Sequence, residues 1–96
     1  MTISKTINGS EAVFKLEGWL DTQAAPELDA EIEALDPKIE SLIMDFEGVE
    51  YIASSGVREV VAAYKKVNGN LTLKNVSEGI MDIFSATGID KKITFA

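Results

Sequence analysis

The chain has 96 residues, 46% hydrophobic and 26% charged, which is the profile of one small globular domain with a single core. It contains no cysteine and no histidine, which excludes disulfides, thiolate metal sites, cysteine nucleophiles and Ser-His-Asp catalysis. A net charge of −7 disfavours nucleic-acid phosphate and anionic lipid as partners. No apolar run approaches the ~20 residues of a membrane span, and the first residues lack an apolar signal core. We therefore expect a single cytoplasmic domain over residues 1–96, without metal, cofactor or catalytic residues, that works by contacting another protein.

The first elements are predicted to be two strands. Residues 3–7 form a short strand, and residues 11–17 alternate between apolar and polar side chains. Between them, Asn8-Gly9 is a turn signal, so we expect a hairpin.

A helix is predicted next. Pro26 suits a first helical turn, and three apolar residues then recur on one helical face: Leu28, Ile32 and Leu35. Asp36-Pro37 ends the helix, because a residue before proline is pushed out of the helical region.

The middle of the chain predicts a buried strand and a second helix. Residues 42–46 are nearly all apolar, as in a parallel strand covered on both faces. A second helix is predicted after residues 53–56, and residues 68–70 end it. Its apolar face consists of Val57, Val60, Val61, Tyr64 and Val67.

The C-terminal part repeats this pattern. Residues 71–76 read as a strand, Ser77 caps a third helix that ends at Gly88, and residues 92–95 alternate as a last strand. The third helix is expected to turn Ile80, Ile83 and Phe84 inward. The order β-β-α-β-α-β-α-β predicts an α/β fold, a mixed sheet of about five strands with parallel crossovers and helices packed against it.

The stretch from Tyr51 to Val57 is the most informative for function. A strand runs into Ser54, Ser55 and Gly56, and a helix starts at once. Free backbone N–H groups and the positive end of the helix dipole meet there and favour an anion, such as a phosphate carried by a serine. The same serines could instead serve as helix caps, and the spacing leaves both roles open.

Two further residues are candidates for contact with a partner. Asp21 follows a strand and precedes a helix, so it could orient a hydroxyl at the same sheet edge or act as an N-cap. Trp19 falls on the outward register of its strand, where it could anchor an interface or pack on the first helix.

The stretch from Leu42 to Val57 resembles the signature of the STAS domain, the family of bacterial anti-sigma factor antagonists and sulphate-transporter tails. Gly18-Trp19-Leu20-Asp21, followed by Ala25-Pro26-Glu27-Leu28, is similar to the other motif of the family. The resemblance extends over nearly the whole chain and implies a STAS-like fold.

The resemblance also implies a mechanism. A stand-alone STAS protein binds an anti-sigma factor that is a serine kinase of the histidine-kinase-like ATPase type, and the kinase switches it off by phosphorylation. A PP2C-type phosphatase reverses the modification. The phosphorylated serine of the motif falls on Ser54, while Ser55 is its hydroxyl neighbour or a cap and Asp21 is the acid beside the site. Trp19 and Gly56 complete the expected partner-binding set, with Ala53 at the position where the family often has aspartate.

Two other functions remain open from the sequence. A constitutive STAS subunit or scaffold, such as the partner of a lipid-transport ATPase, is favoured by Ala53. A small nucleotide-binding enzyme is disfavoured, because neither G-x-x-x-x-G-K-S/T nor G-x-G-x-x-G is present.

Overall fold

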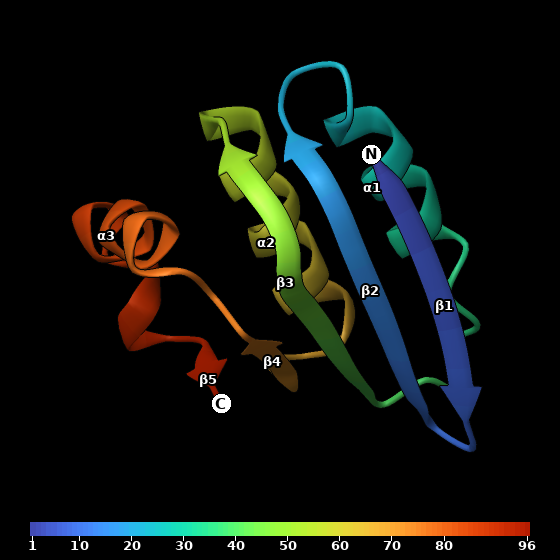
Figure 1. Cartoon of the computed structure of the whole chain (residues 1–96). Coiled ribbons are helices and arrows are strands. Elements are labelled where there is room, and N and C mark those ends of the chain that lie inside the picture. The colour runs from blue at the N-terminus through green and yellow to red at the C-terminus, as the bar shows by residue number, and fades with distance from the viewer.

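The computed structural model describes all residues of the chain, 1–96. One five-stranded mixed sheet runs in the order β1-β2-β3-β4-β5, as Figure 1 shows. Strands β1 and β2 are antiparallel, and every later neighbour is parallel, which confirms the predicted α/β architecture. The elements are β1 (Thr2–Asn8), β2 (Glu11–Leu20), α1 (Ala25–Glu33), β3 (Ser41–Ile52), α2 (Ser54–Lys66), β4 (Leu71–Lys74), α3 (Glu78–Thr87), the 3-10 turn η1 (Ile89–Lys91) and β5 (Thr94–Phe95).

The predicted hairpin joins β1 to β2. Asn8 pairs with Glu11 across the turn, and Gly9 has φ +62°, a backbone conformation that side chains disfavour.

The core lies between the sheet and its helices. Figure 1 shows α1 and α2 on one face of the sheet, behind β2 and β3. On that face α3 joins them, because Phe84 packs edge-on against Phe46 of β3 and at a tilt against Phe95 of β5, with ring centroids 6.1 and 6.0 Å apart. The fully buried side chains include Phe14, Leu16, Leu28, Ile32, Leu42, Met44, Val60, Leu71, Leu73 and Phe84. The opposite face of the sheet carries no helix.

Three of the predicted signals at helix ends are confirmed, but α1 ends at Glu33 and not at Asp36-Pro37, because Leu35 N closes a shorter turn on Ile32 O at 3.2 Å. Pro26 stands in the first turn of α1, and Ser77 Oγ accepts a hydrogen bond from Ile80 N at 3.3 Å at the start of α3. Gly88 ends α3 in the left-handed conformation at φ +78°. The prediction that Ile83 points inward is wrong, because α3 buries only Ile80 and Phe84 and leaves Ile83 exposed.

The strand bounds differ from the predicted ones. β2 continues to Leu20 and β3 to Ile52, because their parallel pairing extends past the point where each strand's own alternation breaks. β4 stops at Lys74, since Asn75 takes a left-handed conformation at φ +57°. η1 occupies the space before β5, which leaves only Thr94–Phe95 as strand. None of the helices has the length and apolar character needed to span a bilayer.

Candidate functional site

The candidate site lies at the sheet edge where β2 and β3 end together. Leu20 and Ile52 are paired, and Ala53 N donates to Leu20 O at 2.9 Å. The residues that follow the two strands therefore lie close together. The loop from Asp21 towards α1 and the start of α2 leave from this edge, at the top of Figure 1. Parallel topology therefore brings Asp21 and Ser54 to the same edge, as predicted.

Ser54 is the first residue of α2 and is exposed. Its hydroxyl takes part in none of the side-chain hydrogen bonds of the chain. Val57 N makes the first helical hydrogen bond, to Ala53 O at 3.1 Å. The N–H groups of Ser54, Ser55 and Gly56 therefore precede the hydrogen-bonded part of the helix and point toward its open end. A hydroxyl in this place is accessible, and a negative charge on it would meet these N–H groups.

Of the two roles that the sequence left open for these serines, helix capping is wrong. The N-cap is Ala53, with an extended backbone at φ −97° and ψ 170°, and no side chain accepts a hydrogen bond from the first turn. Both serines lie inside the helix, where their hydroxyls cannot reach forward to the N–H groups that a cap would satisfy. Ser55 Oγ instead donates to Thr22 Oγ1 at 3.4 Å and so ties α2 to the loop after β2. This contact was not predicted, because a partner 33 residues away leaves no local signal in the sequence.

Asp21 shapes the loop that leads into α1. Its Oδ1 accepts hydrogen bonds from Gln23 N at 3.1 Å and Ala24 N at 2.9 Å, and its carbonyl accepts one from Ala25 N at 2.9 Å. The N-cap of α1 by position is Ala24, so Asp21 acts one turn earlier than a cap would. The half-buried carboxylate thereby fixes the loop that carries Thr22 to the site.

Gly56 lets the first turn of α2 rest directly on the end of β2. A Cβ at this position would lie 2.7 Å from both Leu20 O and Leu20 Cγ, and 2.9 Å from Ile52 Cγ1. Two of these atoms belong to buried side chains and one to the backbone, so none can easily move away. Glycine is therefore a steric requirement of the site.

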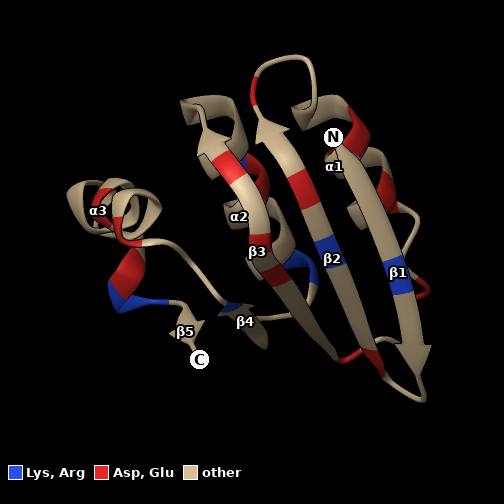
Figure 2. Cartoon of the chain, viewed as in Figure 1, with Lys and Arg blue, Asp and Glu red and all other residues tan.

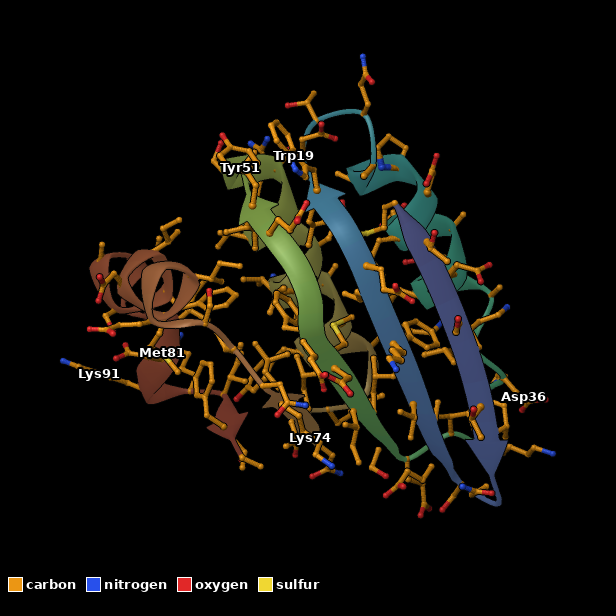
Figure 3. All side chains as sticks on the ribbon, viewed as in Figure 1. Trp19, Asp36, Tyr51, Lys74, Met81 and Lys91 are labelled. Carbon is orange, nitrogen blue, oxygen red and sulfur yellow. The ribbon has the colours of Figure 1, made fainter.

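Trp19 lies on the open face of the sheet, beside Tyr51 (Figure 3). The two side chains are 57% and 46% exposed, and their ring centroids lie 5.3 Å apart with an interplanar angle of 43°. Because α1 covers the opposite face, the alternative that Trp19 packs on the first helix is wrong. Tyr51 was not predicted to take part: it reaches Trp19 because register shifts between Lys15 and Glu17 and between Gly18 and Trp19 insert extra β3 residues into the pairing.

Two carboxyl groups have displaced pKa values. Burial, followed by the hydrogen bond to Asp29 and the charge of that neighbour, raises the pKa of Glu59 to about 7. This pair of acidic side chains bridges α2 and α1. Hydrogen bonds from Asn75 and from the backbone N–H of Glu47 lower the pKa of Asp45 on β3. No group of three or more carboxylates is arranged to hold a metal ion.

Comparison with known proteins matches residues 2–96 to the STAS domain. No curated protein sequence matches the chain significantly. Among solved structures, the Bacillus cell fate determinant SpoIIAA in its phosphorylated form is similar, with a TM-score of 0.77 and 22% identity over 99% of this chain and 91% of that one. An anti-sigma factor antagonist from Mycobacterium paratuberculosis has a TM-score of 0.83 and 23% identity, covering 98% of this chain and 83% of its own. A putative anti-sigma factor antagonist from Thermotoga maritima has a TM-score of 0.86 and 14% identity, with coverage of 97% and 84%.

Proposed function

Because the chain belongs to the STAS domain family, whose stand-alone members are non-catalytic regulators, we propose that it is an anti-sigma factor antagonist. It binds an anti-sigma factor that is also a serine kinase, of the histidine-kinase-like ATPase type, and this contact frees a sigma factor. The kinase phosphorylates Ser54 and thereby ends the interaction. A PP2C-type phosphatase returns the protein to its binding form.

The observation that carries this proposal is the position of Ser54. Its exposed hydroxyl stands at the open start of α2 and is held by no other side chain of the protein. A kinase can therefore approach it without unfolding any element. The structural likeness to SpoIIAA, a protein that was solved in a phosphorylated form, supports phosphorylation as the means of control.

Electrostatics explains how phosphate at Ser54 would act as a switch. A phosphoryl group adds about −1.5 to −2 charges, which the N–H groups and dipole at the start of α2 stabilise, so the fold need not change. A kinase must hold the terminal phosphate of ATP against the Ser54 hydroxyl. After transfer, phosphoserine faces the anionic nucleotide phosphates across the interface, and like charges at close range repel. The modified protein is thereby released.

Kinase treatment of two matched variants tests the proposal. The anti-sigma factor kinase is co-purified from the native host and incubated with ATP and wild type, Ser54→Ala or Ser55→Ala, and the products are examined by mass spectrometry. We expect one phosphate on wild type and Ser55→Ala and none on Ser54→Ala. The proposal fails if phosphate is absent from wild type or persists in Ser54→Ala.

Ala53 supports a second candidate, a constitutive STAS scaffold without phosphorylation control. An acid beside the serine would help a kinase to engage it, and this chain offers only a methyl group there. In this case the same edge binds a permanent partner, such as the ATPase of a lipid transporter. Recovery of a transporter ATPase in the co-purification, with no phosphate on Ser54, would establish the scaffold role.

A further inference from the structure

We propose that Trp19 and Tyr51, with the carboxylates of Glu17 and Glu50, form a receptor for an arginine side chain of the partner protein. We call these four residues the aromatic platform. The inference deepens the proposed function and rests on it for the premise that a partner docks at this edge. It adds the chemistry by which that partner is recognised.

The aromatic pair is the first part of the evidence. Trp19 is 57% exposed and Tyr51 46%, and their rings contact each other in a tilted arrangement on a face that no helix covers. Figure 3 shows both side chains at the end of the sheet from which α2 begins. Glycine at position 18, with φ +106°, and the nearby register shifts maintain this local geometry. Large exposed aromatic side chains beside an interaction site are typical anchors of protein interfaces.

The charge around the pair is the second part. Glu17 lies two residues before Trp19 on the same face of β2, and Glu50 directly precedes Tyr51 on β3. Both are exposed, and Figure 2 shows acidic segments in the upper parts of β2 and β3. Before α2, the basic residues nearest in sequence are Lys15, exposed two residues before Glu17 on β2, and Lys38, in the connection that enters β3 at its opposite end. Arg58, the next basic residue, belongs to α2 on the other face of the sheet.

These two features together select a guanidinium group. A cation is attracted to the faces of tryptophan and tyrosine, and a neighbouring carboxylate can form a charge-assisted hydrogen bond with the same cation. Arginine is planar, stacks on rings and binds carboxylates with two parallel hydrogen bonds, whereas the compact, strongly hydrated lysine ammonium does so less well. The platform therefore fits an arginine that projects from a basic surface. An acidic partner surface would be repelled.

Trp19 gives a direct readout, because it is the only tryptophan of the chain. The probe is the blocked peptide acetyl-Gly-Arg-Gly-Arg-Gly-amide, compared with its lysine and glutamate counterparts at constant ionic strength. Tryptophan fluorescence and amide chemical shifts in ¹⁵N spectra are followed during the titration. We expect a saturable change centred on the platform, with the arginine peptide binding roughly two- to fivefold more tightly than the lysine peptide and no response to the glutamate peptide.

Matched variants separate the platform from general attraction to an acidic protein. Glu17→Gln with Glu50→Gln removes two exposed carboxylates at the platform, and Glu33→Gln with Glu40→Gln removes two exposed carboxylates elsewhere. We expect the first pair to weaken arginine-peptide binding at least threefold more than the second. Tyr51→Ala should abolish the preference for arginine over lysine, with folding checked by circular dichroism. Equal affinity for both peptides in wild type, or equal losses in both double variants, would overturn the inference.

This titration needs no kinase, so its outcome is independent of phosphorylation at Ser54. If the arginine preference is observed and Ser54 is never phosphorylated, the result supports the platform and refutes the kinase-controlled switch. If Ser54 is phosphorylated and the arginine preference is absent, the result supports the switch and refutes the platform.

Discussion

Replacing Glu59 by glutamine should make the stability of the protein less dependent on pH. Glu59 has an ordinary pKa of 4.5, which burial and Asp29 raise to about 7 in the folded protein. Between these values the folded state binds more protons than the unfolded chain. The stability that protonated Glu59 contributes is therefore complete below pH 4.5 and is lost as the pH rises through 7.

The structure sets the size of this effect. A displacement from 4.5 to about 7 corresponds to about 3 kcal/mol between the acidic and alkaline limits, and solvent screening of a side chain that is only partly buried reduces this to about 1–2 kcal/mol. Glutamine cannot ionise, and its amide can donate to Asp29 at every pH. Glu59→Gln should therefore be more stable than wild type by about 1–2 kcal/mol at pH 8 and nearly equal to it at pH 5.

Urea unfolding between pH 5 and pH 8, followed by circular dichroism, measures this difference, with all points above the sequence isoelectric point near 4.4. Glu40→Gln is the matched control, because Glu40 is exposed and lies outside α1 and α2. Its free energy of unfolding should depend on pH in the same way as that of wild type. The reasoning is refuted if wild type and Glu59→Gln lose stability in parallel over this range, because Glu59 would then titrate equally in the folded and unfolded states.

Three further variants test other parts of the structure. Gly56→Ala should lower the free energy of unfolding by about 1–3 kcal/mol in urea titrations, since its Cβ would overlap Leu20 O and Cγ at 2.7 Å. Asn75→Gly keeps the left-handed backbone but removes the amide that binds Asp45, so the pKa of Asp45 should rise toward its ordinary value in an NMR titration. Above pH 3.8, the lowered pKa of Asp45 adds to the free energy of unfolding, and this contribution is lost as the pH falls. The contribution should be smaller in Asn75→Gly. Ser54→Glu should leave the protein as stable as wild type or up to about 1 kcal/mol more stable, owing to the helix dipole, while a pull-down with the kinase shows lost binding.

The layered fold could be predicted from the sequence because hydrophobic periodicity reports directly on burial. The alternation around Phe14 and the helical spacing of Leu28 and Ile32 identified side chains that are fully buried. Their order along the chain then fixed the parallel connections. These signals are local, so each can be read from a window of a few residues.

The ends of the central strands could not be predicted, because they depend on pairing between strands. Beyond Lys15, the β2–β3 ladder continues only by inserting extra β3 residues. Gly48 permits the close approach there, since a Cβ would lie 2.7 Å from Glu17 Cγ on the neighbouring strand. The alternation of apolar and polar residues in β3 is interrupted at these insertions, so the sequence after the first insertion predicts a loop although the strand continues. The same insertions place Tyr51 beside Trp19, so the sequence indicated an exposed Trp19 but not its aromatic neighbour.

Ser54 became a candidate because serines between a strand and a predicted helix are a local signal, but the absence of a competing side chain becomes visible only when the three helix starts are compared. At α1, Asp21 O accepts from Ala25 N, and Pro26 has no N–H to satisfy. At α3, Ser77 Oγ accepts from Ile80 N. At α2 the N-cap is Ala53, whose methyl group accepts nothing. The start of α2 is therefore the one place where backbone donors and an exposed hydroxyl coincide without a competing side chain, and a phosphoryl group added there would find its stabilising donors already in position.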